Sequence, residues 1–194
     1  MTSRLLLWLI LLGLFASEIK AQPQASTYVW PPTPSTSRFQ VAVFRKRIQL
    51  EKIPEKADIH LFADSRYILW VYGQSLGFGP ARSYPAHPEY DTYDLSPYLQ
   101  EGNNLIAVQV WSNGTSSFQL RRMPAAFIAW GNIGEHSLRT PGNWRVLPLQ
   151  GYDAEMVRMS FALGPMERYD ARKDPPNWMN PEAQVMDQPV VSIK

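Results

Sequence analysis

The chain has 194 residues, of which 45% are hydrophobic and 12% aromatic, so it holds enough apolar material for a folded core and is not disordered throughout. Its 19 Lys and Arg residues against 17 Asp and Glu residues give a net charge of +2, which does not favour nucleic acid as a partner. No cysteine is present, which excludes disulfides, thiolate nucleophiles and cysteine zinc sites. The 17 prolines and many aromatic residues, without an internal repeat, are typical of a loop-rich β protein.

The first 21 residues have the layout of a secretory signal peptide. Arg4 supplies a positive start, an apolar run follows over 5–16, and small residues lead to Ala21. Cleavage after Ala21 predicts a mature chain that begins at Gln22, with cleavage after Ala16 as the alternative. The apolar run is shorter than the roughly 20 residues of a membrane span, so we expect no membrane association after cleavage. The predicted location is secreted or periplasmic, in a bacterial envelope.

Proline spacing divides the rest of the chain. Residues 22–37 carry prolines among Ser and Thr and are interpreted as a linker or extended edge segment that Trp30 pins to the body. Residues 38–163 are predicted to form the folded domain. Residues 164–194 again carry spaced prolines and are interpreted as a second linker.

Alternating apolar residues predict many short strands in the body. In 41–50, Ala42, Phe44 and Ile48 share one face, while Arg45 lies on the other. Segment 66–72 is apolar on both faces, which indicates a strand buried twice or one that presents an aromatic face to a ligand or domain. The other predicted strands are 58–63, 75–78, 104–111, 126–130 and 144–149.

Helix signals are nearly absent. The best one is short, with Ser96 as a cap, Pro97 at the first helical position and Gly102 as a stop. Many short strands separated by turn residues predict an all-β chain, an antiparallel β-sandwich or jelly roll with Pro-rich terminal segments.

Motifs of the common hydrolytic and metal chemistries are missing. The three histidines form no His-x-x-x-His pair, and no Gly-x-Ser-x-Gly occurs. The run 77–80 resembles a phosphate loop only faintly, because it lacks the third glycine and the lysine. Acids gather at 89–94 and 167–174, but spacing along a sequence does not place two carboxylates across a sugar. No catalytic residue and no metal ligand is therefore assigned.

The central segment from Asp64 to Trp111 carries a series of short motifs. They are an acidic turn before an aromatic strand, a turn at Gly73, Gly77-x-Gly79-Pro80-x-Arg82, Tyr90-Asp91-x-Tyr93-Asp94, and a strand with Ile106-Ala107-Val108. Flanking stretches extend the likeness over most of residues 38–174, namely Phe44-Arg45-Lys46, Trp144-Arg145-Val146 and Tyr169-Asp170-Ala171-Arg172. In order and spacing these motifs resemble the N-terminal β-sandwich (jelly-roll) module of bacterial α-L-rhamnosidases.

The resemblance implies a secreted glycoside hydrolase whose acidic catalytic residues lie in a helical barrel further downstream. The resemblance makes the chain an N-terminal fragment or a truncated gene product, in which the linker 164–194 leads to a missing downstream domain. The chain is then an accessory module, carbohydrate-contacting or scaffolding, and not catalytic by itself. Rings that stack on a sugar and polar groups that bind its hydroxyls are the expected substrate contacts, namely Trp70, Tyr72, Trp111, Arg82, Asp91 and Asn113. For the aromatic residues, packing in the core or against a downstream domain is the alternative.

Two other functions stay open, a free-standing carbohydrate-binding protein of the envelope and a purely structural domain that braces the catalytic barrel. The expected partners are a rhamnose-containing glycan and the downstream catalytic domain. We expect no cofactor, although some similar sandwiches use calcium; the sequence does not identify oxygen ligands for it.

Two local expectations concern the same segment. The hairpin of such modules often reads Asn-Gly, whereas here it is Tyr72-Gly73, and Tyr tolerates the positive φ of a type I′ turn poorly. By alternation, Asp91 shares a strand face with Leu95, which is expected to point to the core. The Asp91 carboxylate is therefore expected to turn partly inward, where it needs a hydrogen-bond donor. Arg82 is the nearest candidate in sequence, so we predict an Arg82–Asp91 pair that holds the loop over 83–90.

Overall fold

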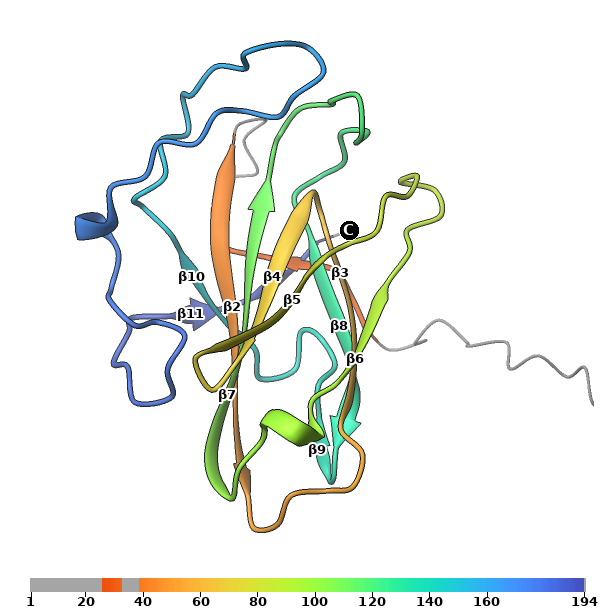
Figure 1. The fold of residues 1–194 in the computed structure, drawn as a ribbon, viewed down its shortest axis with the longest axis vertical. Helices are drawn as coiled ribbons and strands as arrows, with labels where there is room; N and C mark the ends of the chain where they lie inside the picture. Colours follow the sequence, from red (N-terminus) through yellow and green to blue (C-terminus); the bar gives the residue numbers. More distant parts are fainter. Residues whose placement is uncertain (1–25, 33–38, 194) are drawn as a thin grey trace, which may run out of the picture.

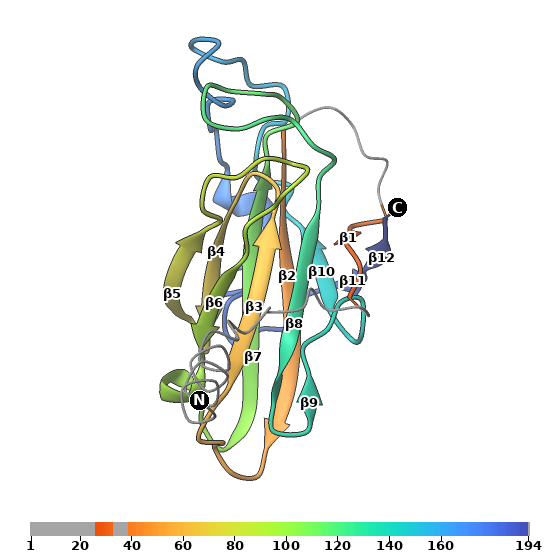
Figure 2. The same ribbon diagram turned by 90° about the vertical axis from the view of Figure 1, so that its right-hand side faces the viewer.

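The computed structural model describes residues 26–32 and 39–193, so the predicted signal peptide lies outside the described residues. The described chain folds into two antiparallel sheets that face each other (Figures 1 and 2). The predicted fold class, an antiparallel β-sandwich, is confirmed.

One sheet has the strand order β12-β1-β8-β3-β6, and β9 pairs with β8 beside this path. Its strands are β1 (Val29–Trp30), β3 (Asp58–Ala63), β6 (Asp91–Asp94), β8 (Phe127–Ile133), β9 (His136–Ser137) and β12 (Val191–Ser192). The other sheet has the order β11-β10-β2-β7-β4-β5. Its strands are β2 (Gln40–Leu50), β4 (Arg66–Val71), β5 (Gln74–Gly79), β7 (Gly102–Ser112), β10 (Arg145–Pro148) and β11 (Gln188–Pro189).

The core lies between the two sheets and is built around large aromatic side chains. Phe44 of β2 stacks on Phe127 of β8 with ring centroids 4.5 Å apart, and Phe127 meets Trp144 edge-on at 5.3 Å. All three side chains are buried. Alternation along β2 sends Phe44 and Ile48 into this core, as its sequence period predicts.

A second apolar cluster lies on the outer face of the sheet that holds β2, β7 and β10, where the C-terminal part of the chain covers it. Trp178 packs edge-on against Trp70 at 6.0 Å, and Tyr152 packs against Trp111 at 6.3 Å. Segment 149–187 thus acts as a third layer over one sheet, which Figure 1 shows as the blue chain beside β10 and β11.

The two segments interpreted as linkers both contribute strands. Within 22–37, β1 pairs with β12 and with β8, and Trp30 is buried and donates its Nε1 hydrogen bond to Gln40 Oε1 at 2.9 Å. Within 164–194, β11 pairs with β10 and β12 pairs with β1. The sheets therefore extend beyond the expected boundary of 38–163 on both sides.

The Tyr72-Gly73 turn joins β4 to β5, and Val71 pairs with Gln74 across it. Tyr72 has φ 50° and Gly73 has φ 78°, so both central residues adopt the left-handed region that a type I′ turn requires. The described helices are two short 3₁₀ turns, Ser96–Tyr98 and Ala171–Lys173. In the part of the chain that the structure describes, no helix is long and apolar enough to cross a bilayer.

Candidate functional site

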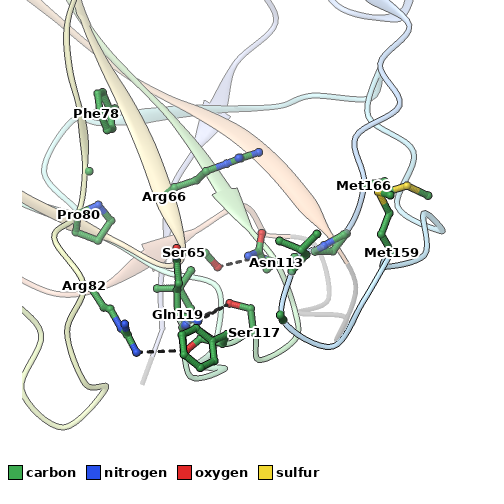
Figure 3. A pocket seen from close by; sticks show the side chains of 17 residues that line it. Ser65, Arg66, Phe78, Pro80, Arg82, Asn113, Ser117, Gln119, Met159 and Met166 are labelled. Carbon is green, nitrogen blue, oxygen red and sulfur yellow. Dashed lines mark hydrogen bonds between the residues drawn. The ribbon is translucent and has the colours of Figure 1, made fainter.

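An open cleft of about 740 Å³ lies at one end of the sandwich, between loops that follow the strands. The turn between β3 and β4, the end of β5 and the chain after it, the loop after β7, and the segment 159–166 supply its walls. Figure 1 shows these loops together at the upper end, and Figure 3 shows the lining side chains.

Two arginines bring cationic donors to the cleft. The Arg66 guanidinium forms an ion pair with Glu167 and lies 4.9 Å from the centre of the Trp111 ring. Arg82 Nη2 donates to the Phe118 carbonyl at 3.3 Å, and its guanidinium lies 5.7 Å from the Phe118 ring centre. Both side chains point into the cleft in Figure 3. Half of the Arg66 side-chain surface is exposed, and Arg82 is exposed as well.

Apolar side chains stand exposed around the same cleft. Phe78 is 84% exposed, Phe118 is 71% exposed and Met159 is 76% exposed. Phe161, beside the lining residue Ala162, is 82% exposed. Large apolar side chains that are exposed together mark a binding surface more often than isolated ones do. This end of the sandwich is therefore a candidate binding surface.

A buried polar cluster supports the wall behind the cleft. The Asp64 carboxylate accepts hydrogen bonds from Ser112 Oγ at 2.7 Å and from Ser65 Oγ at 3.3 Å. Ser65 Oγ in turn accepts a hydrogen bond from the backbone N–H of Asn113 at 3.0 Å. Burial raises the pKa of Asp64 from 3.8 to about 6, although its two hydroxyl donors work in the opposite direction. These bonds fix Asn113 where the loop after β7 begins.

The predicted Arg82–Asp91 pair is wrong. The Asp91 carboxylate accepts a short hydrogen bond from the Tyr67 hydroxyl, which also lies 3.1 Å from the Tyr93 hydroxyl. Arg82 is exposed and lies against Phe118. Asp91 does turn inward as its strand face predicts, but a tyrosine of the opposite sheet satisfies it, so no guanidinium is needed.

The structure brings together only some of the predicted contact residues. Arg82 and Asn113 line the cleft, and Trp111 lies beneath the Arg66 side chain. Trp70 packs against Trp178, and Tyr72 lies in the β4–β5 hairpin at the other end of β4 from Arg66. Trp70 and Trp111 both belong to the apolar cluster on the covered outer face.

Sequence reasoning missed the phenylalanines of the cleft and a group of aromatic residues elsewhere. On the outer face of β3 and β8, the His60 ring stacks on Trp130 at 5.3 Å, and Tyr90 meets Trp130 edge-on at 4.8 Å. His60 pairs with Trp130 across the ladder, so alternation along 58–63 places His60 opposite the core residues Ile59 and Leu61. The alternation of residues along 58–63 could therefore have predicted that His60 lies on the outer face of this strand.

The described residues hold no group of three His, Asp or Glu side chains placed to bind a metal ion together. Within the described ranges the acids beside the cleft are already engaged, Glu167 with Arg66 and Asp64 with two serines.

Comparison with known proteins finds similarity to parts of larger enzymes and to a lectin. No family model matches it. The β-galactosidase of Vibrio cholerae is 35% identical over 77 residues, which is 37% of this chain and 7% of that enzyme. A lectin from Pleurotus ostreatus shares the fold, with TM-score 0.55 and 17% identity over 87% of this chain and 41% of the lectin.

Rhamnosidases cover more of the chain and align more closely. The GH78 family rhamnosidase of Bacillus sp. GL1 has TM-score 0.81 and 30% identity, covering 89% of this chain and 19% of that enzyme. The α-L-rhamnosidase of Aspergillus terreus has TM-score 0.69 and 16% identity, covering 88% of this chain and 21% of the enzyme. The chain is thus similar over almost nine-tenths of its length to a β-sandwich module of GH78 α-L-rhamnosidases, and it spans only about a fifth of those enzymes.

Proposed function

We propose that the chain is an accessory, carbohydrate-contacting module of a secreted α-L-rhamnosidase-like glycoside hydrolase, with the hydrolytic residues in a domain outside this chain. The likeness to about one fifth of the Bacillus rhamnosidase, at 30% identity, is the observation that supports it best. The proposal includes export by the predicted signal peptide. N-terminal sequencing of exported protein should give Gln22 as the first residue, and mature material that retains residues 1–15 would contradict export by cleavage.

The chemistry of the cleft suits a sugar. A pyranose has apolar ring faces and a rim of hydroxyls, so it needs flat apolar surface beside hydrogen-bond donors and acceptors. Phe78 and Phe118 offer exposed rings, and Arg82, Asn113 and Gln119 offer polar groups. Ligand sites of this kind combine mostly apolar walls with a few placed polar groups.

The cleft favours binding over hydrolysis. Glycosidases use a pair of carboxyl groups across the scissile bond. None of the described residues that line the cleft is Asp or Glu. Glu167, which follows the lining residue Met166, forms an ion pair with Arg66. A module that holds a glycan for a separate catalytic domain is consistent with this lining.

The exposed apolar residues of the segment 157–163 support a second candidate, a structural domain that braces the catalytic domain. Val157 is 66% exposed, Phe161 is 82% exposed and Leu163 is 53% exposed. Such a surface also fits contact with another domain of the same enzyme. The free-standing carbohydrate-binding protein differs from the first candidate only in having no catalytic partner.

Calorimetric titration of the mature chain with L-rhamnose and rhamnose-containing oligosaccharides separates the two carbohydrate-binding candidates from the bracing domain. Phe118→Ala and Arg82→Gln should each weaken binding about tenfold or more, since each removes a central contact. Tyr84→Ala is the matched control, because Tyr84 is 70% exposed but does not line the cleft. No binding at millimolar sugar would favour the bracing domain. If Trp130→Ala alone abolished binding, the sugar would bind on the outer face of β3 and β8 and not in the cleft.

A further inference from the structure

Lys46 occupies a core-facing position of β2. It lies between Phe44 and Ile48 on the strand face that packs between the sheets, and it pairs with the buried Ile106 of β7. Only 3% of its surface is exposed. A lysine with so little exposure is unusual unless something pairs with its charge.

The Lys46 side chain reaches a cavity at the edge of the sandwich. This cavity, of about 350 Å³, is bounded by the β9 hairpin and the loop over 139–143. The Lys46 ammonium nitrogen lies 3.8 Å from the position that a Cβ on Gly142 would occupy. The loop glycine therefore leaves the end of the lysine side chain facing the cavity.

Within the described part of the chain, the Lys46 ammonium has neither a hydrogen-bond partner nor an ion-pair partner. Burial lowers its pKa, and no charge of opposite sign works against that. The neighbouring Arg45 shows the usual solution, because it is equally buried but donates to Asp187 at 2.6 Å and to the Trp178 carbonyl. Lys46 is therefore a buried cation that its own protein leaves uncompensated.

The other charged groups at the cavity do not correct this. Arg139 adds a second cation, and Glu135 is the one acid among the described lining residues. His136 Nε2 lies 2.7 Å from the Gln49 carbonyl and, as the donor to that oxygen, is used internally. An incoming anion would thus meet two cations and one carboxylate.

We propose that this cavity binds a small oxyanion, with the Lys46 ammonium as its principal ligand and Arg139 as a second donor. A carboxylate or phosphate oxygen supplies both the negative charge and the acceptors that a buried ammonium lacks. A divalent cation is repelled by the same charges, and a neutral sugar leaves the ammonium uncompensated. The site is separate from the cleft and does not depend on glycan binding there.

Two sources share this chemistry, the uronate of an acidic sugar and inorganic phosphate. Thermal unfolding and calorimetric titration of the mature chain with D-glucuronate, inorganic phosphate and D-glucose distinguish them. We expect a rise in Tm and saturable binding with at least one anion and no response to D-glucose, the neutral counterpart of glucuronate. A response to glucuronate alone identifies an acidic sugar, and a response to phosphate alone identifies a phosphate group.

Variants assign the effect to the cavity. Lys46→Met keeps the apolar stem and removes the charge, so it should fold and weaken anion binding about tenfold or more, the loss expected for one charge-assisted hydrogen bond. Arg139→Gln should weaken binding less, and Glu135→Gln should strengthen it, because each changes the charge facing the anion. Lys52→Met, at an exposed loop lysine, is the matched control and should leave binding unchanged.

Equal anion binding in the native chain and in Lys46→Met would overturn the proposal, and so would the absence of any response to both anions. If Lys46→Met does not fold, the opposite shifts expected of Arg139→Gln and Glu135→Gln decide the question. Rhamnose titration of the same variants reports on the cleft separately, so failure of one site leaves the other measurable.

Discussion

The hydroxyl of Tyr67 donates a hydrogen bond to the carboxylate of Asp91 across the space between the two sheets. Tyr67 belongs to β4 and Asp91 to β6, so the bond joins strands that no backbone ladder connects. Burial is the largest cause of the raised pKa of Tyr67, and the carboxylate beside its hydroxyl raises that pKa further. Together with the contact between the Tyr67 and Tyr93 hydroxyls, this bond links β4 and β6 through polar groups.

Tyr67→Phe should lower the free energy of unfolding by about 1–3 kcal/mol, because it leaves the partly buried Asp91 carboxylate without its donor. Urea unfolding followed by tryptophan fluorescence measures this. Arg82→Gln is the control and should change stability by less than about 0.5 kcal/mol, since Arg82 lies on the surface. If Arg82→Gln lowered the free energy of unfolding more than Tyr67→Phe does, the Arg82 guanidinium and not the Tyr67 hydroxyl would be the partner of Asp91.

Asp64 should make stability depend on pH in the mildly acidic range. Its pKa is raised from 3.8 to about 6 in the folded state, so the folded chain binds the proton more tightly than the unfolded chain does. The stabilising contribution is complete below pH 3.8 and is lost as pH rises towards 6, by about 3 kcal/mol in total.

Asp64→Asn should remove that dependence, because the amide does not ionise. The measurement is the difference in the free energy of unfolding between the native chain and Asp64→Asn, taken at intervals from pH 4 to pH 7. We expect the difference to move in favour of the variant as pH rises. A difference that is constant across this range would show that the Asp64 carboxyl has an ordinary pKa in the folded chain.

Trp178→Ala should destabilise the fold by about 3–5 kcal/mol, the range for removing a buried tryptophan. Trp178 is 7% exposed and packs against Trp70 on the outer face of the sheet. Met186→Ala in the same segment is the matched control, because Met186 is 96% exposed and should tolerate the change. If both variants unfold at the same urea concentration as the native chain, segment 149–187 does not contribute to the stability of the sheet it covers.

The chain alone should not hydrolyse aryl α-L-rhamnosides. The cleft has no lining carboxyl group among the described residues, and hydrolysis with acid and base roles needs two. Release of the aryl group by rigorously purified protein is the measurement, with Glu167→Gln and Asp91→Asn as variants. Turnover that survives purification and disappears in either variant would contradict this expectation.

Strand positions could be predicted from the sequence because alternation is a local signal. Segment 58–63 is the observed β3, and 41–50 differs from β2 by one residue. The partner of Asp91 could not be predicted, because Tyr67 lies 24 residues away in a strand of the other sheet. Proximity in sequence favoured Arg82, but proximity in space is set by how the sheets stack.

The local sequence pattern of a strand also does not show whether a distant segment of the chain packs over it. When only its own strand is considered, Trp70 is predicted to be an exposed ring on which a sugar can stack. It is partly buried because Trp178 packs on it from more than one hundred residues away. The cleft was partly found, through Arg82 and Asn113, since both follow strand ends where loops gather.

The pairing of β1 with β12 has a consequence for the way the protein must fold after synthesis. Strand β1 lies beside β12, near the C-terminal end of the described chain (Figure 2). Val29 pairs with Ser192 of β12 and with Phe127 of β8, so the ladder of β1 is complete only when residues far apart in sequence have come together. During synthesis, β1 therefore lacks this partner until Val191 and Ser192 have been added to the chain. A pairing between strands so far apart in sequence requires a long loop to close first, so we expect this ladder to form late in folding.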